Sequence, residues 1–197
     1  MSTYVILLGP PGSGKGTQAV RLAEALGLAH ISTGDLFRAM RSDDTPLARR
    51  VQEIMARGDL VPDDVVLEMV TERLARPDCA KGVILDGFPR TIAQADALNA
   101  MLTEQFNGRV TVALQLKVSE AEVVARIKGR AEKENRPDDT EEVARERFRV
   151  YQEQTAPLID YYQTRGLLEV IDGERPIDAI TPDLLAAIRR RQAGGQS

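Results

Sequence analysis

A glycine-rich loop near the start of the chain constrains the fold more than any other feature of the sequence. Residues 9–17 read G-P-P-G-S-G-K-G-T, follow the apolar run 4–8 and lead directly into a helical pattern. Glycines let backbone N–H groups turn toward an anion without side chains in the way, and the start of the next helix adds partial positive charge. Because Lys15 adds a full charge, the order of strand, loop, lysine and helix predicts a phosphate-binding loop rather than a purely structural turn.

The loop departs at one position from the general nucleotide-binding pattern G-x-x-x-x-G-K-[ST]. Gly16 stands where that pattern has a magnesium-binding Ser or Thr, and Thr17 comes one place later. The metal would have to be held by another residue. This departure argues against a simple GTPase or a motor ATPase.

Composition limits the class of protein and its partners. At 197 residues the chain fits one domain, and its formal net charge of −4 argues against a nucleic-acid or membrane-surface binder. No apolar run approaches the ~20 residues of a membrane-spanning helix, and the chain starts with a strand instead of a signal peptide, so we expect a cytoplasmic protein. A lone Cys79 and a lone His30 offer neither an internal disulfide nor a set of zinc ligands.

Apolar, strand-like runs alternate with helical patterns along the chain. The runs occupy residues 4–8, 28–31, 83–85, 110–116 and 167–171. This alternation predicts an α/β fold, in which a parallel sheet of five strands is covered by helices on both faces.

The helical patterns also indicate how the domain is divided. Helices are expected over about 15–26, 36–40 after capping residues at 32–35, 46–56, from 60–64 through 75, 91–102, 119–127, 140–162 with a kink at Pro157, and 176–190. Between residues 129 and 140 the chain is charged and non-periodic. The predicted parts are a core (1–31, 62–129 and 140–191), a small helical insertion (32–61), a short lid loop (130–139) and a disordered tail (192–197).

Several unusual segments follow the predicted strands and should converge, because ligands of open α/β sheets bind at the carboxyl ends of the strands. Residues 9–18, S-T-G-D-L-F-R at 32–38 and D-G-F-P-R-T at 86–91 together resemble the adenylate kinases, as do R-P-D-D at 136–139, Arg147 and T-A-P-L-I at 155–159. These segments keep the family's order and spacing over nearly the whole chain. The resemblance implies a P-loop kinase fold and reversible, magnesium-dependent phosphoryl transfer, ATP + AMP = 2 ADP.

The resemblance also implies which residues form the site. The implied ATP-binding residues are Gly12, Ser13, Gly14, Lys15, Gly16, Thr17, Arg126, Arg130 and Gly173. The implied AMP-binding residues are Thr33, Arg38, Asp59, Leu60, Val61, Gly87, Phe88, Pro89, Arg90, Gln94, Arg136 and Arg147. Among them, Lys15, Arg90, Arg136 and Arg147 would be catalytic because they would neutralise charge on the transferring phosphate.

Asp86 resembles the family's acidic residue that holds magnesium through water, which would answer the absence of Ser or Thr at position 16. The implied cofactor is Mg²⁺ with ATP, and the partners are ATP, AMP and ADP, without nucleic acid or membrane. We expect a monomer that serves adenine nucleotide balance.

The predicted lid is short. Five residues separate Arg130 from Arg136, too few for a strand-rich lid, and none of them is a cysteine that could bind zinc. We therefore expect a small loop that carries both arginines toward the phosphates, with Asp138 and Asp139 as ion partners in the closed form.

Three other interpretations remain open at this point. A UMP/CMP kinase shares the loop and the D-G-F-P-R segment, but that family usually has Ala and Asn at the positions of Thr33 and Thr91, and Gln94 also favours adenine. A nucleotide-dependent switch, or a binding protein with a decayed site, would not need Arg38 and Arg90. Some of the arginines could also belong to solvated helix faces: Arg126 with Arg130, or Arg145, Arg147 and Arg149.

Overall fold

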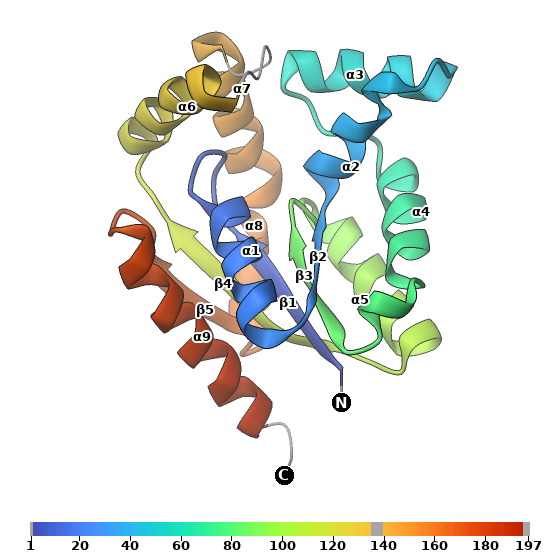
Figure 1. Cartoon of the computed structure of the whole chain (residues 1–197), viewed down its shortest axis with the longest axis vertical. Helices are drawn as coiled ribbons and strands as arrows, with labels where there is room; N and C mark the ends of the chain where they lie inside the picture. Colours follow the sequence, from blue (N-terminus) through green and yellow to red (C-terminus); the bar gives the residue numbers. More distant parts are fainter. Residues whose placement is uncertain (1, 135–139, 195–197) are drawn as a thin grey trace.

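A five-stranded parallel sheet forms the centre of the molecule (Figure 1). The computed structural model describes residues 2–134 and 140–194, with side chains from 128 to 134 left aside. The strand order is β2-β3-β1-β4-β5. The strands are β1 (Thr3–Leu8), β2 (Ala29–Ser32), β3 (Gly82–Asp86), β4 (Val110–Lys117) and β5 (Leu168–Asp172). The predicted α/β class and the five parallel strands are confirmed.

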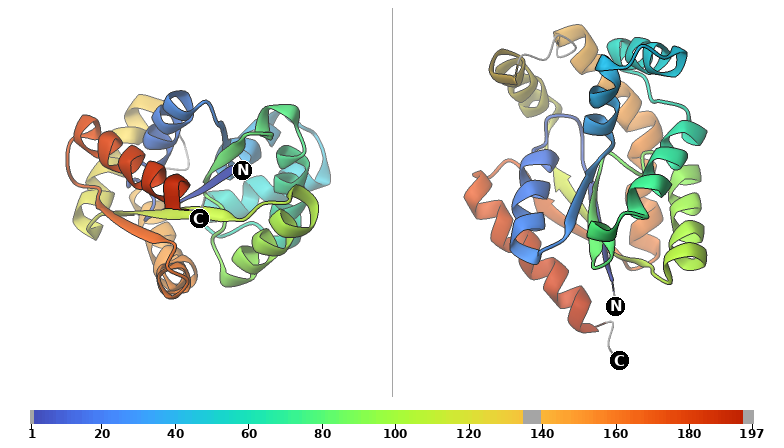
Figure 2. Two further views of the ribbon diagram at one scale, coloured as in Figure 1. Left: turned by 90° about the horizontal axis from the view of Figure 1, so that it is seen from below. Right: turned by 45° about the vertical axis from the view of Figure 1, so that its right-hand side comes forward.

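The central strand β1 packs on both faces, as its unbroken apolar run predicts. Alternate side chains point to opposite faces of a strand, so Tyr4, Ile6 and Leu8 enter one apolar core and Val5 and Leu7 enter the other. Figure 2 shows helices α1 (Lys15–Leu26) and α9 (Ile177–Gly194) on one face of the sheet. Helices α5 (Ile92–Phe106) and α8 (Pro157–Thr164) lie on the other.

Two groups of helices stand beyond the carboxyl ends of the strands (Figure 1). One group is α2 (Thr33–Ala39), a short 3₁₀ helix (Met40–Ser42) and α3 (Pro46–Arg57), from which the chain returns through α4 (Asp63–Leu74). The Ser32 and Thr45 hydroxyls cap α2 and α3 by accepting the Asp35 and Ala48 N–H groups. The other group is α6 (Glu120–Glu134) and α7 (Glu141–Val150), so the glycine-rich loop after β1 lies between the two groups of helices.

The predicted end of helix 119–127 was wrong, because α6 continues to Glu134. Residues 130–134, expected as the first half of the lid loop, are therefore helical. Ala131, Glu132, Lys133 and Glu134 are strong helix formers, and their propensity extends the helix without an apolar stripe. The remaining lid residues, 135–139, lie outside the described residues.

The long helix predicted over 140–162 is interrupted in a specific way. Thr140 caps α7 as predicted, its hydroxyl accepting the Val143 N–H. A π-helix (Tyr151–Thr155) then precedes α8. In this π-helix the Ala156 N–H donates to the Tyr151 carbonyl at 2.8 Å. Proline cannot donate a backbone hydrogen bond, and the wider turn places Pro157 at the first position of α8, where none is needed.

The tail predicted to be disordered from residue 192 is helical as far as Gly194. The end of α9 is held against the sheet, since the Gln192 amide donates to the Thr3 hydroxyl at 2.9 Å. Arg191 adds an ion pair with Glu169 at 2.7 Å. Residues 195–197 lie outside the described residues. Across the described part of the chain, none of the helices has both the length and the hydrophobicity that crossing a membrane requires.

Candidate active site

A cavity of about 1190 Å³ lies over the carboxyl ends of β1, β2 and β3. Its size exceeds the ~300–1,000 Å³ that is usual for one small ligand. We call its two sides the loop end and the insertion end. The loop end comprises Gly9, residues 11–17, Arg126 and residues 173–177, and the insertion end comprises Thr33, Arg38, Arg90, Gln94 and Arg147.

At the loop end, the backbone curls around the Lys15 ammonium. Lys15 Nζ donates to the Gly9 and Pro10 carbonyls, each at 2.8 Å. Gly12 has φ +76°, and a Cβ there would lie 3.0 Å from Ile127 Cγ1 and 3.3 Å from the Val123 carbonyl oxygen of α6. Only glycine combines this conformation with such a close approach of the loop to α6.

Two predicted ATP-binding residues outside the loop also line this end. Arg126 reaches the Ser13 carbonyl at 3.5 Å while pairing with Glu122 at 2.6 Å. It therefore belongs both to a helix-surface ion pair and to the cavity wall. Gly173 packs so closely that a Cβ would lie 2.7 Å from Val118 Cγ2. The Arg130 side chain is outside the described side chains.

At the insertion end, one carbonyl organises two side chains. The Gly87 carbonyl accepts a hydrogen bond from the Thr33 hydroxyl at 2.9 Å and another from Arg90 Nε at 2.8 Å. Gly87 itself has φ +79°, and a Cβ there would lie 2.7 Å from the Thr33 hydroxyl oxygen. The turn after β3 thus fixes Thr33 and Arg90 relative to each other, although they lie far apart in the chain.

Gln94 is almost completely buried at 2% exposure, yet it forms part of the cavity wall. Its Oε1 accepts the Arg90 backbone N–H at 2.7 Å, and its Nε2 donates to Asp63 Oδ1 at 2.6 Å. The side-chain amide is therefore held on two sides by the protein.

Three arginines bring positive charge to this end. Arg38, Arg90 and Arg147 all line the cavity. Arg90 is partly exposed to the solvent that fills the cavity. The protein packed around its guanidinium group lowers its pKa. The negative charge of Asp86 opposes this shift, whereas the positive charges of Arg147 and Arg38 add to it. Mutual repulsion of this kind is relieved when an anion binds among the guanidinium groups, so the cluster favours a phosphate ligand.

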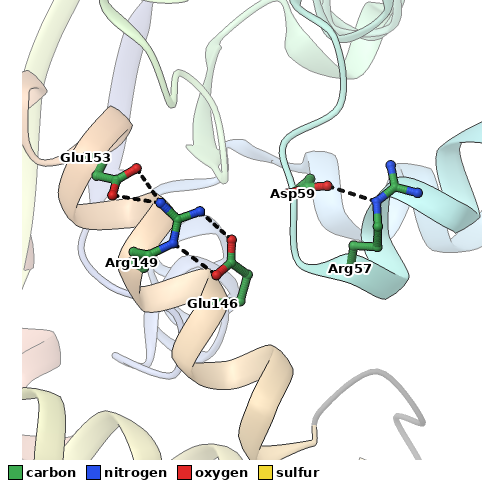
Figure 3. Close-up of polar contacts among 5 residues, drawn as sticks. All are labelled: Arg57, Asp59, Glu146, Arg149 and Glu153. Carbon is green, nitrogen blue, oxygen red and sulfur yellow. Dashed lines mark hydrogen bonds and ion pairs between the residues drawn. The ribbon is translucent and has the colours of Figure 1, made fainter.

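The arginines of α7 do not all face the cavity. Arg145 pairs with Glu141 at 3.1 Å, and Arg149 is clamped between Glu146 and Glu153 (Figure 3). Arg147 instead lines the cavity and passes Gly58, where a Cβ would lie 3.2 Å from its Cγ. The solvated-face interpretation thus holds for the two neighbours and not for Arg147.

Asp86 lies between the two ends, at the end of β3. Burial opposes ionisation of this side chain, but the nearby His30, Lys15 and Arg90 outweigh it and hold the pKa of the carboxyl below its usual value. His30 Nε2 is 3.8 Å from Asp86 Oδ2, beyond hydrogen-bond distance. An anionic oxygen beside a phosphate-binding loop has the chemistry that Mg²⁺ and its water ligands require.

Other predicted residues fall into three groups. Asp59, Leu60, Val61 and Pro89 line the cavity, and Asp59 also pairs with Arg57 at 3.0 Å (Figure 3). The Phe88 side chain does not: it is 1% exposed and packs in the apolar core, so the predicted contact of Phe88 with AMP stays a prediction. Arg136 lies outside the described residues.

Part of the cavity lining was not predicted from the sequence. Glu174, Arg175, Pro176 and Ile177 follow Gly173 along the loop end, and Tyr151 and Thr155 of the π-helix also line the cavity. The rule that ligands bind at strand carboxyl ends could have indicated residues 174–177, which directly follow β5. The π-helix left no recognisable pattern in the sequence.

Comparison with known proteins identifies the family. The model of the family described as adenylate kinase matches residues 7–167. The chain is 49% identical over 187 residues to an adenylate kinase of Thermobifida fusca, covering 95% of this chain and 98% of the relative. It is 50% identical over 184 residues to one of Thermus thermophilus, covering 93% and 96%. With the phosphate-binding loop and the arginine cluster in one cavity and these similarities along nearly the whole chain, the protein belongs to the adenylate kinase family.

Proposed function

We propose that the cavity holds ATP at the loop end and AMP at the insertion end, and that the protein catalyses the reversible reaction ATP + AMP = 2 ADP. Membership of the family makes the chain a phosphotransferase of the nucleoside monophosphate kinase type. The observation that carries the assignment of the two ends is that one cavity joins a backbone-built anion site to a separate cluster of arginines.

At the loop end, Gly12 to Thr17 would bind the ATP phosphates through backbone N–H groups. The Lys15 ammonium now lies on the Gly9 and Pro10 carbonyls and is 3.3 Å from the Ser13 hydroxyl. A bound phosphate would compete for this ammonium, which could then follow the phosphoryl group as it moves. Arg126 and Gly173 would border the adenosine part, with Arg130 reaching the phosphates from α6.

At the insertion end, Arg38, Arg90 and Arg147 would hold the AMP phosphate, and Arg136 would join them at the transferring group. Phosphoryl transfer requires in-line placement of donor and acceptor and neutralisation of charge on the equatorial oxygens, with little covalent chemistry for the protein to do. The arginines supply the charge, while Thr33 and Gln94 would fix the adenine and so align the attacking oxygen.

Magnesium would bind near Asp86. Gly16 adds no side chain beside this carboxylate, where a Cβ would lie in van der Waals contact with Asp86 Oδ2 at 3.5 Å. Asp86 would hold the ion through water, and the bound ion would neutralise charge on the ATP phosphates. The described residues contain no group of three or more His, Cys, Asp or Glu side chains placed to hold a metal. The absence of a zinc site in the complete chain remains a prediction, because residues 135–139 are not described.

An acceptor panel tests this function. ADP formation from ATP and Mg²⁺ is followed with AMP, UMP, CMP or GMP as acceptor, and kcat/KM should be highest for AMP. Equal efficiency with UMP or CMP would favour the UMP/CMP kinase alternative. ATP binding without transfer to any acceptor would favour a nucleotide-dependent switch. A monomer acting in the cytoplasm completes the proposal, and sedimentation and cell fractionation test that part.

A further inference from the structure

We propose that Asp63 is a positioning residue that sets base specificity at the insertion end. It would lock the Gln94 side-chain amide in the one orientation that fits adenine and rejects a 6-oxopurine. This inference rests on the proposed function, in which Gln94 contacts the acceptor base. Asp63 itself would touch no substrate, because it does not line the cavity.

Asp63 occupies the first turn of α4 and reaches across to the start of α5. Its Oδ1 accepts from Gln94 Nε2 at 2.6 Å, and its Oδ2 accepts from the Thr91 hydroxyl at 3.4 Å. The Thr91 hydroxyl also caps α5 by accepting the Gln94 backbone N–H at 3.1 Å. The carboxylate is therefore tied to the same helix start that carries Gln94.

The two partners of the Gln94 amide have opposite and fixed polarity. Asp63 as a carboxylate can only accept, and the Arg90 backbone N–H can only donate. If the amide rotated by 180°, its oxygen would face the Asp63 carboxylate and its NH₂ would face the Arg90 N–H. Because Gln94 is 2% exposed, water could not relieve either conflict.

The locked amide keeps one N–H and one oxygen lone pair for a ligand. Adenine offers a matching pair on its Watson–Crick edge, with N1 as acceptor and the 6-amino group as donor. Hypoxanthine reverses both, because its N1 carries a proton and its 6-oxygen accepts. A freely rotating amide could serve either base, so discrimination requires that the amide be locked.

Two groups hold the Gln94 amide: the Asp63 carboxylate and the Arg90 backbone N–H. Only the first depends on the type of side chain, since every residue except proline supplies a backbone N–H. An asparagine at position 63 would keep the size of the side chain but could present either its oxygen or its NH₂. It would therefore accept both orientations of Gln94. Asp64 offers a matched control: it is exposed and shares the first turn of α4, so its replacement removes the same charge from the same helix terminus.

The experiment compares AMP with IMP, which differ only at positions 1 and 6 of the purine. We measure kcat/KM for both acceptors, with ATP and Mg²⁺, in the wild type and in Asp63→Asn, Asp63→Ala and Asp64→Asn. The ratio of kcat/KM for AMP to that for IMP should fall about ten-fold or more in both Asp63 variants, as expected when a charged, partly buried hydrogen bond is lost. It should stay within about two-fold in Asp64→Asn, and the KM for ATP should stay within about two-fold in all variants.

Partial unfolding does not affect the test, because both constants come from one preparation and inactive protein cancels in their ratio. Two Asp63 variants that keep the wild-type ratio would overturn the inference while leaving the proposed function intact. A ratio that falls equally in Asp64→Asn would also overturn it, because the effect would then come from α4 as a whole. If the wild type does not phosphorylate AMP, the proposed function itself fails.

Discussion

The two ends of the cavity recognise their ligands by different means. The loop end is built mainly from backbone, with glycines at 9, 12 and 14 at positive φ and one lysine folded onto two carbonyls. The insertion end is built from side chains that other parts of the chain hold in place, such as Thr33 on the Gly87 carbonyl and Gln94 on Asp63. The difference follows from the proposed ligands: phosphate oxygens accept from any N–H group, whereas a base edge requires donors and acceptors in a fixed order.

We expect the largest effect on turnover at Lys15, because its charge would reach from the loop end to the transferring phosphoryl group. Lys15→Ala should lower kcat by about 100-fold or more, because it removes a cation aimed at the transition state. The variant should stay folded, since the carbonyls of Gly9 and Pro10 that the lysine contacts belong to its own loop, and its unfolding midpoint should fall modestly because Asp86 loses a nearby cation. Steady-state kinetics and thermal unfolding of the variant measure both. Near-normal turnover would show that the loop binds phosphate through backbone alone.

The next effect separates two arginines that lie two residues apart on α7. Arg147→Ala should lower kcat/KM for AMP by about 10- to 100-fold, because it removes one cation of the proposed phosphate site. Arg149→Ala should change it by less than about three-fold, since Arg149 is exposed and forms ion pairs with Glu146 and Glu153 on its own helical segment. Both variants are assayed under one set of conditions. Equal losses would mean that the charge of the helix as a whole, rather than the cavity-lining side chain, matters.

A methyl group added at Gly12 should weaken ATP binding at the loop end without affecting AMP binding. Gly12→Ala should raise the KM for ATP by about ten-fold or more, because alanine is strained at φ +76° and its Cβ would crowd Ile127 and the Val123 carbonyl. Gly194→Ala is the control, with open space around the position. The KM values for ATP and AMP are measured separately in each variant. An unchanged KM for ATP in Gly12→Ala would contradict the tight-loop account.

The smallest expected effect is a pH dependence of stability at Asp86, where the two ends meet. Because the folded-state pKa of Asp86 is lowered, its stabilising contribution is complete above the unfolded-state pKa of about 4 and is lost as pH falls through the folded-state pKa. In Asp86→Asn, the free energy of unfolding should therefore fall less steeply between about pH 5 and 2. Denaturant titrations across this range compare the slopes, and parallel curves would contradict the shift.

Local patterns in the sequence predict the glycine loop itself but not the contacts that hold the insertion end in place, and the reason is physical. A glycine loop between a strand and a helix is a local pattern, and the unbroken apolar runs of the strands are equally visible. The contacts of Thr33 with Gly87, and of Asp63 with Gln94, join residues 54 and 31 positions apart. No spacing rule predicts such pairs. The same limit explains why periodicity alone could not separate Arg147 from Arg145 and Arg149, since it places all three on a charged helix; the resemblance to the family singled out Arg147.

Three other differences came from tertiary contacts or special turns. The Gln192 amide reaches Thr3 and keeps the end of α9 helical, although local composition favours a free tail. Pro157 inside a helical pattern predicts a kink, because proline lacks a backbone N–H, but it does not predict that the kink takes the form of a π-helix. Phe88 shares a motif with proposed ligand-binding residues but packs into the core, because a motif does not show which of its side chains point inward.

The claim that one cavity joins a donor and an acceptor is tested most directly by product stoichiometry. Phosphorus NMR follows the purified protein with equal ATP and AMP in the presence of Mg²⁺. The account predicts that ATP and AMP disappear together, that two ADP form for each AMP consumed, and that no inorganic phosphate accumulates while both substrates remain. Release of inorganic phosphate with AMP unchanged would contradict it, because the loop end would then deliver its phosphoryl group to water and not to a nucleotide at the insertion end.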